Sequence, residues 1–116
     1  AFAPYDGPMR FYLYDRDRQT ATFLFVHRPE LEGLGLARMR PLEIPARDGL
    51  ALVSYLTLPA GIEGEIPPSP LPMVLSLHGG PWSRDEWGYE PTHQWLANRG
   101  YAVLSVNYRG STGFGK

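Results

Sequence analysis

Two short apolar runs flank a helical pattern in the second half of the sequence, and this arrangement restricts the fold more than any other feature. MVLSLH at residues 73–78 and YAVLSV at residues 101–106 are typical of strands buried on both faces. YEPTHQWLANRG, residues 89–100, has a proline suited to a first helical turn and a glycine suited to a left-handed stop. We predict a helix that turns Trp95 and Leu96 toward the core. Strand, helix and strand in about 35 residues form a βαβ unit with a parallel pair.

A hairpin is predicted immediately before this unit, at about residues 42–58. PLEIPA alternates apolar and polar residues, as a half-buried strand does, and Pro45 suits an edge strand because it cannot donate to a ladder. The RDG triplet at 47–49 is a turn, and ALVSYLTLP is the second arm. Residues 59–72 are too rich in proline and glycine for a helix or ladder. The fold class is therefore α/β, with an antiparallel edge hairpin followed by a βαβ unit.

An earlier hairpin is predicted at residues 10–27. RFYLYD and TATFLFVH are aromatic and β-branched, and RDRQ between them is a polar turn. Both arms are apolar on both faces, so they need cover from neighbouring structure. Residues 28–40 have no clean period and are read as a linker with a helical turn.

The composition excludes several functional classes. With 43% hydrophobic residues, 20% charged residues and a net charge of −1, the chain is globular and has no basic field for nucleic acid or an anionic membrane. The absence of cysteine removes disulfides, thiolate metal sites and a cysteine nucleophile. Three histidines at 27, 78 and 93 have no metal-ligand spacing, so we expect neither metal nor cofactor.

Two glycine-rich loops, residues 78–83 and 107–115, follow the two strands of the βαβ unit. Ligands bind at the carboxyl ends of parallel strands, so we expect both loops on one rim of the sheet. In His78-Gly79-Gly80-Pro81, adjacent glycines permit torsions closed to other residues and let a substrate approach the backbone. Since proline has no N–H, the amides of Gly79 and Gly80 are the candidate donors to an oxyanion. The alternative is a tight strand-to-helix turn without a ligand.

Other side chains near this rim have less specific interpretations. Arg109 either clamps a substrate carboxylate or braces its loop through a salt bridge, and we favour bracing. Trp82 and Tyr108 are candidates for lining a substrate cleft. His93, within the predicted helix, is expected to be structural. No Gly-x-Ser-x-Gly motif occurs in the 116 residues.

The sequence from residue 41 onward resembles the start of the catalytic domain of the prolyl oligopeptidase family of serine peptidases. PLEIPARDGLALVSYLTLPAG, LSLHGGPW and WLANRGYAVLSVNYRGSTGFGK carry the likeness, which is greatest to the acylaminoacyl-peptidase and dipeptidyl-aminopeptidase branch. Residues 10–27 resemble the last strands of the β-propeller that precedes this domain. The resemblance implies the end of a propeller at residues 1–30, a linker at 31–40, and the N-terminal part of an α/β-hydrolase domain at 41–116.

The family resemblance also implies a Ser-Asp-His triad and an oxyanion hole that includes the His-Gly-Gly-Pro loop. Gly80 is the expected backbone donor, Gly79 is second, and His78 belongs to the same loop. Arg109, Gly110 and Ser111 match the loop that lies near the catalytic serine. In the family the triad follows this loop, so we expect all three residues beyond residue 116 and the chain alone to be inactive.

The function implied is peptide-bond hydrolysis by acyl transfer, releasing acylated residues or dipeptides, with a peptide as substrate. We expect the remainder of the enzyme to pack against the last strand, a cytoplasmic location with export left open, and a homo-oligomer as an open alternative. Two rival functions remain. A carboxylesterase or lipase also uses a His-Gly-Gly loop, commonly with a third glycine where Pro81 stands. A non-catalytic hydrolase-like binding module would lack the serine elbow.

Overall fold

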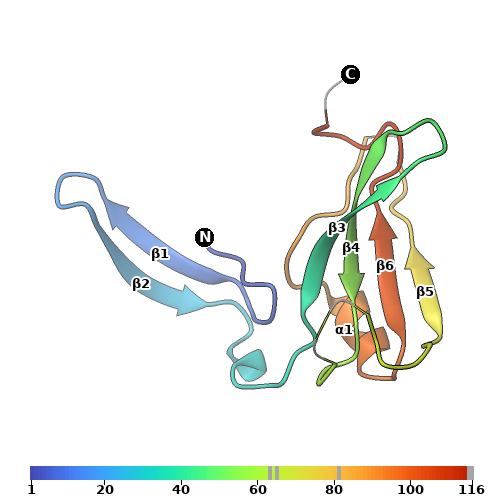
Figure 1. The fold of residues 1–116 in the computed structure, drawn as a ribbon. Coiled ribbons are helices and arrows are strands. Elements are labelled where there is room, and N and C mark those ends of the chain that lie inside the picture. The colour runs from blue at the N-terminus through green and yellow to red at the C-terminus, as the bar shows by residue number, and fades with distance from the viewer. Residues whose placement is uncertain (63, 65, 81, 115–116) are drawn as a thin grey trace.

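The chain folds into two separate sheets, and Figure 1 shows them at opposite sides of the molecule. The computed structural model describes residues 1–62, 64, 66–80 and 82–114. The expectations that fall on Pro81, on parts of the 59–72 loop and on the end of the 107–115 loop lie outside the described residues. No helix in the described ranges is long and apolar enough to span a bilayer.

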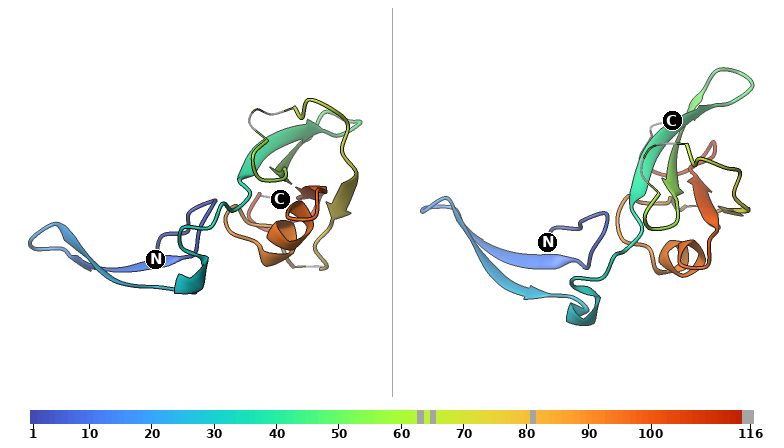
Figure 2. Two further views of the ribbon diagram at one scale, coloured as in Figure 1. Left: turned by 90° about the horizontal axis from the view of Figure 1, so that it is seen from below. Right: turned by 60° about the horizontal axis from the view of Figure 1, so that its bottom comes forward.

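The predicted first hairpin is confirmed. Strand β1 (Arg10–Asp15) pairs antiparallel with β2 (Thr20–Val26), and a 3-10 turn, η1 (Pro29–Leu31), follows within the predicted linker. The two views of Figure 2 agree that this hairpin extends away from the other sheet. Leu13 is 61% exposed, and its neighbour Tyr14, on the other face, is 58% exposed. Apolar side chains are thus exposed on both faces, in agreement with the expectation that the two arms need cover from neighbouring structure.

The second hairpin is also confirmed, with slightly earlier bounds. Strand β3 (Met39–Pro45) pairs antiparallel with β4 (Ala51–Thr57). The turn between them closes on Gly49, whose φ of 86° favours glycine. The strand order is β3-β4-β6-β5, so β3 and its proline lie at an edge, as predicted.

The βαβ unit consists of β5 (Met73–Ser76), α1 (Pro91–Ala97) and β6 (Ala102–Val106). Strands β5 and β6 are parallel, and β6 also pairs antiparallel with β4. Because β6 is paired on both sides, it has no free edge with which a strand from the remainder of the enzyme could pair. The helical crossover places β6 between β4 and β5, and the open edge belongs to β5.

Strand β5 is not buried on both faces, contrary to the prediction. Met73 is 57% exposed, and Leu75 and Leu77 are each 55% exposed. Met73 and Leu75 alternate along the strand and so share one face of the sheet, and Leu77 directly follows the strand. Helix α1 packs on β4 and β6, and no described segment covers that face of β5.

Helix α1 buries His93 and Ala97, which are four residues apart and therefore share a face. The prediction that Trp95 faces the core is wrong: it is 56% exposed, and the Arg99 guanidinium lies 4.5 Å from its ring centroid. Trp95 is two residues from His93, which places it on the opposite side of the helix. Glu90 caps the helix by accepting a hydrogen bond from the His93 amide at 2.7 Å.

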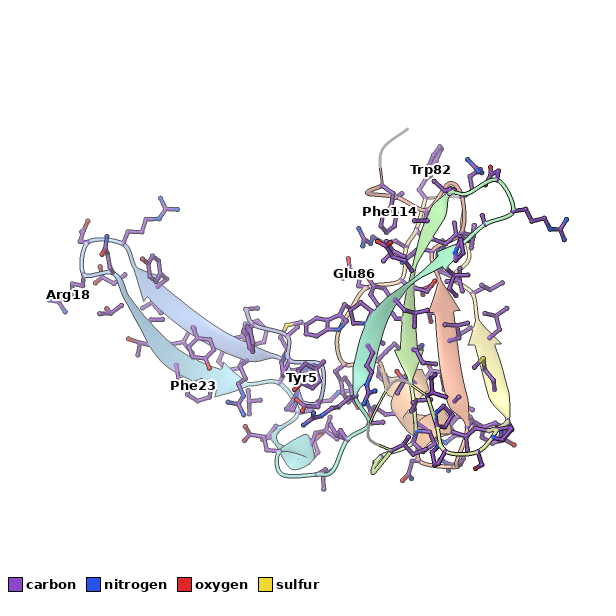
Figure 3. All side chains as sticks on the ribbon, in the orientation of Figure 1. Tyr5, Arg18, Phe23, Trp82, Glu86 and Phe114 are labelled. Atoms are coloured by element: carbon purple, nitrogen blue, oxygen red, sulfur yellow. The ribbon has the colours of Figure 1, made fainter. Side chains whose placement is uncertain are left out.

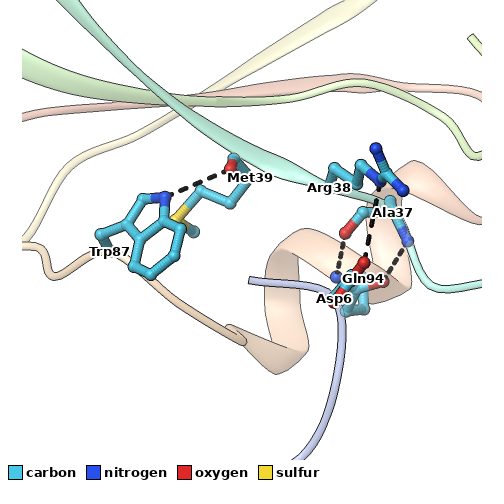
Figure 4. A network of polar contacts seen from close by, with 6 residues as sticks. All are labelled: Asp6, Ala37, Arg38, Met39, Trp87 and Gln94. Atoms are coloured by element: carbon cyan, nitrogen blue, oxygen red, sulfur yellow. Dashed lines mark hydrogen bonds and ion pairs between the residues drawn. The ribbon is translucent and has the colours of Figure 1, made fainter. Parts of the chain in front are cut away.

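A polar network joins the linker to helix α1 (Figure 4). Gln94 donates to the Ala37 carbonyl at 2.7 Å and accepts from the Ala37 amide at 2.9 Å. The Trp87 indole donates to the Met39 carbonyl at 3.3 Å, and Arg38 pairs with Asp6 at 3.7 Å. These contacts attach the N-terminal segment to the βαβ unit.

Candidate active site

The loops that follow β5 and β6 lie side by side, as predicted from their parallel strands. The Thr112 amide donates to the Ser83 carbonyl at 2.9 Å. Asn107 accepts from the Asp85 amide at 2.8 Å and donates to the Asp85 carbonyl at 3.2 Å. Figure 3 shows Trp82 and Phe114, one from each loop, at the same end of the sheet. The two loops therefore form one rim.

His78 and Tyr108 join the two loops at this rim. Their rings stack with centroids 4.4 Å apart and planes 17° from parallel. The Tyr108 hydroxyl donates to the His78 carbonyl oxygen at 2.9 Å. Tyr108, predicted as a candidate for lining a substrate cleft, therefore contacts His78 through both its ring and its hydroxyl.

The hydrogen bonds of the His78 ring define its tautomer. Nδ1 lies 2.8 Å from the Gly79 carbonyl oxygen, which can only accept, so Nδ1 carries the proton. Nε2 lies 2.7 Å from the Ser111 hydroxyl. In the neutral ring Nε2 is then an acceptor, and Ser111 donates to it. His78 therefore holds a backbone carbonyl with one nitrogen and is held by Ser111 through the other.

These bonds orient the two predicted donor amides. In a trans peptide the C=O and N–H point in opposite directions within one plane. The His78 carbonyl shares its peptide with the Gly79 amide, and the Gly79 carbonyl shares its peptide with the Gly80 amide. Tyr108 holds the first carbonyl and His78 holds the second. Each candidate donor therefore belongs to a peptide whose opposite side is already hydrogen-bonded.

The amides of Gly79 and Gly80 are free to bind a ligand. Neither donates a hydrogen bond to any group in the described ranges, and both residues are exposed. Neither has a positive φ, so the expectation of torsions closed to other residues is not met. A Cβ at Gly79 would meet nothing within 4 Å, and one at Gly80 would lie 3.7 Å from the Tyr108 hydroxyl. What glycine provides here is an open approach to the backbone.

Arg109 and Trp82 differ in how firmly the structure holds them. Arg109 forms a close ion pair with Asp48 in the β3–β4 turn, which agrees with the favoured bracing role over a substrate clamp. Trp82 is two residues after Gly80 and is 85% exposed. It is therefore available to a molecule bound at the rim.

Two serine–histidine pairs occur in the described part of the chain, and neither has an accessible nucleophile. Ser105 lies 2.8 Å from Nε2 of His93, whose Nδ1 lies 2.8 Å from the Thr57 hydroxyl. Ser105 is 3% exposed, and Ser111 beside His78 is 5% exposed. A nucleophile must reach its substrate, so both pairs are structural. The structural role expected for His93 is confirmed.

Burial shifts the pKa values of His93 and Asp85. It lowers the pKa of His93 below 6.5, against the opposing effect of Glu90 and Asp85. Burial raises the pKa of Asp85 above 3.8, and its Oδ2 has no hydrogen-bond partner among the described residues. Within those same ranges, no group of three or more His, Asp or Glu side chains could hold a metal ion.

Comparison with known proteins shows similarity along the whole chain. No model of a known protein family matches. Dipeptidyl aminopeptidase BIII of Pseudoxanthomonas mexicana is 55% identical over 120 residues, which cover 100% of this chain and 17% of that protein. Dipeptidyl peptidase family member 6 of Caenorhabditis elegans is 39% identical over 128 residues, covering 96% of this chain and 17% of its own length.

Solved peptidase structures share the fold. A puromycin-hydrolyzing peptidase of Mycobacterium tuberculosis matches with a TM-score of 0.77 and 28% identity, over 97% of this chain and 18% of that one. The acylaminoacyl peptidase of Pyrococcus horikoshii matches with a TM-score of 0.73 over 97% of this chain and 17% of its own. The chain thus spans about one sixth of these proteins. It is homologous to a segment of the dipeptidyl aminopeptidases, and its structural neighbours are peptidases of the prolyl oligopeptidase family and acylaminoacyl peptidases.

Proposed function

We propose that this chain supplies the oxyanion-binding loop of a serine peptidase. The observation that carries the proposal is the pair of amides at Gly79 and Gly80, which have no hydrogen-bond partner among the described residues and lie beside the carboxyl end of a parallel strand. Their peptides are held from the opposite side, so the donors need no reorganisation when charge develops. A strand-to-helix turn that binds no ligand would not need two exposed amides whose peptides are hydrogen-bonded from the opposite side.

The reaction is acyl transfer to a serine located elsewhere in the full-length protein. The serine oxygen attacks the scissile carbonyl carbon, the hydroxyl proton passes to a general base, and negative charge collects on the carbonyl oxygen. The Gly80 amide donates to that oxygen, with Gly79 as the second candidate donor. One such donor contributes about 3–4 kcal/mol to the transition state. Collapse of the intermediate expels the amine, and water then hydrolyses the ester.

The proposed substrates are peptides from which a dipeptide is released at a free N-terminus. The names of both dipeptidyl peptidase relatives support this choice. Release of an acylated residue is the second candidate, supported by the shared fold of the acylaminoacyl peptidase. Trp82 is exposed and follows the donor amides by two residues, and it is proposed to contact the substrate next to the scissile bond.

We propose that the open edge of β5, rather than the last strand, receives the next strand of the full-length protein. The supporting observations are the unpaired position of β5 in the sheet order and the exposed side chains of Met73, Leu75 and Leu77. A strand paired there would extend the sheet, and a crossover helix connected to it would lie on a face of the sheet and cover exposed apolar side chains such as these.

The proposed function is tested by labelling the full-length protein with a fluorophosphonate probe and locating the label by mass spectrometry. The proposal predicts one labelled serine outside residues 1–116 and loss of peptidase activity on labelling. Fluorogenic dipeptidyl amides with a free amine, acetylated single-residue amides and short-chain esters then separate the two peptidase classes from an esterase. A folded protein without label or activity would favour a non-catalytic module and contradict the proposal.

A further inference from the structure

We infer that Tyr108 and Ser111 are positioning residues for the oxyanion-binding amides, acting through His78. This inference rests on the proposed function, since it assigns the geometry of the same site to a second loop. Neither residue carries a free group aimed at a substrate: one hydroxyl donates to a backbone carbonyl, and the other is buried against the imidazole.

Tyr108 controls the peptide that bears the Gly79 amide. Its hydroxyl is the donor to the His78 carbonyl at 2.9 Å, and its ring lies flat against the imidazole. Rotation of that peptide would break the hydrogen bond. The hydroxyl thus limits the directions that the Gly79 N–H can take, and the stacked ring limits where the imidazole can move.

Ser111 controls the peptide that bears the Gly80 amide, through the tautomer of His78. With Ser111 donating to Nε2, the neutral ring keeps its proton on Nδ1 and holds the Gly79 carbonyl at 2.8 Å. The other neutral tautomer would place the Nδ1 lone pair against the lone pairs of that carbonyl oxygen. The Gly79 carbonyl favours the same tautomer, so loss of the serine hydroxyl removes one of the two hydrogen bonds that maintain it and frees the imidazole to move. The Gly80 amide is then held less firmly in its direction.

The loop that carries both residues is itself anchored. The Asn107 amide donates to the Val53 carbonyl at 3.0 Å, and the Ser111 amide donates to the Tyr108 carbonyl at 3.0 Å. Arg109 pairs with Asp48 in the β3–β4 turn. Asn107 and Ser111 are 3% and 5% exposed. Tyr108 and Ser111 therefore act from a fixed position in the loop after β6, and the glycine loop takes its geometry from them.

The test uses Tyr108→Phe and Ser111→Ala in the full-length protein. Phenylalanine keeps the stacked ring and removes one donor, and alanine removes the other donor with little change in volume. Thr112→Val is the matched control: it removes the neighbouring hydroxyl, which makes no hydrogen bond in the described part of the chain. Thermal unfolding of each variant confirms that it is folded.

The readout compares transition-state binding with ground-state binding. A dipeptidyl trifluoromethyl ketone accepts the serine oxygen at its carbonyl carbon and places an oxyanion in the hole, whereas the free dipeptide product does not. Loss of one positioning bond should lower kcat/KM about tenfold. Inhibitor affinity should fall by the same factor, while product affinity and the Thr112→Val variant stay within about twofold of the unmodified protein.

His78 offers a second test if either variant unfolds. Asparagine places an amide N–H close to the position of Nδ1, whereas leucine has no donor. His78→Asn should therefore retain more kcat than His78→Leu, with similar KM in both.

Four results would overturn the inference, and they are distinguishable. Unchanged kinetics in Tyr108→Phe and Ser111→Ala would refute it while leaving the proposed function intact. Equal losses in product and inhibitor affinity would show a structural role only. An unmodified, folded protein that neither labels nor cleaves would refute the proposed function and the inference with it. Label on Ser111 itself would make that residue a nucleophile and contradict the positioning role.

Discussion

The hydroxyl of Tyr108 donates to the carbonyl oxygen of His78 at 2.9 Å, although the two residues are 30 positions apart. The bond is possible because β5 and β6 are parallel neighbours, so the loops after them meet at one rim. The same two rings are stacked, with centroids 4.4 Å apart. The loop with the candidate donor amides is therefore held by the loop that follows the next strand.

Gly113 is predicted to tolerate alanine less well than Gly110. Both have positive φ, at 86° and 94°, so each alanine variant should lose about 1 kcal/mol from backbone strain. At Gly113 a Cβ would also lie 2.6 Å from Nη1 of Arg84, whose guanidinium sits 4.6 Å from the Phe114 ring centroid. Displacing Arg84 should add about 0.5–1 kcal/mol. Urea unfolding of the two variants measures the difference, and equal losses would refute the contribution of the Arg84 contact.

His93 is predicted to make the protein less stable in acid. Since burial lowers its folded-state pKa, the unfolded state binds a proton first as the pH falls below 6.5. Stability should therefore decline from about pH 6.5 and level off below the folded-state pKa. His93→Gln should reduce this decline in a series of thermal unfolding curves, whereas His27→Gln, at an exposed position, should not. A decline that persists in full after His93→Gln would assign it to another group.

Asp85→Asn is predicted to stabilise the protein at neutral pH. Burial raises the pKa of Asp85, so its ionised form costs stability above the folded-state pKa, and Oδ2 has no hydrogen-bond partner among the described residues. The gain should shrink as the pH falls through that pKa and vanish below 3.8. Asp17→Asn in the exposed β1–β2 turn is the control. A loss of stability at neutral pH would show that the carboxylate is needed in its charged form.

The ion pair between Arg109 and Asp48 is predicted to contribute little to stability. The two side chains are 65% and 62% exposed, so water and salt screen their attraction. Asp48→Asn should lower the free energy of unfolding by less than about 1 kcal/mol. The difference should disappear in about 1 M salt, where the screening length falls to about 3 Å. A loss above about 2 kcal/mol that persists in high salt would contradict this interpretation.

Local patterns in the sequence predict the elements of this fold well. Alternation in PLEIPA, the Asp-Gly turn and the proline and glycine around α1 each correspond to an observed feature. The order of the strands in the sheet cannot be predicted from such local patterns, because β6 would show the same apolar pattern in a central position or at an edge. The prediction that Trp95 faces the core failed for a related reason. In a helix of seven residues, one aromatic residue does not indicate which side of the helix packs on the sheet.

The candidate site was predicted in its backbone but not in its side-chain network. The paired glycines after a parallel strand predict donor amides at a rim. The bonds of His78 with Tyr108 and Ser111 join residues 30 and 33 positions apart, and no local pattern encodes them. The one available signal was the parallel pairing of the two strands, which brings the two loops together without specifying the partners.

The most direct test of the central claim is a crystal structure of the full-length protein after reaction with a fluorophosphonate. The account predicts a phosphonyl oxygen about 2.7–3.1 Å from the Gly80 amide nitrogen, with the bonds from His78 to Gly79 and from Tyr108 to His78 intact. A phosphonyl oxygen held by other donors, with the Gly79 and Gly80 amides directed away from it, would contradict the account.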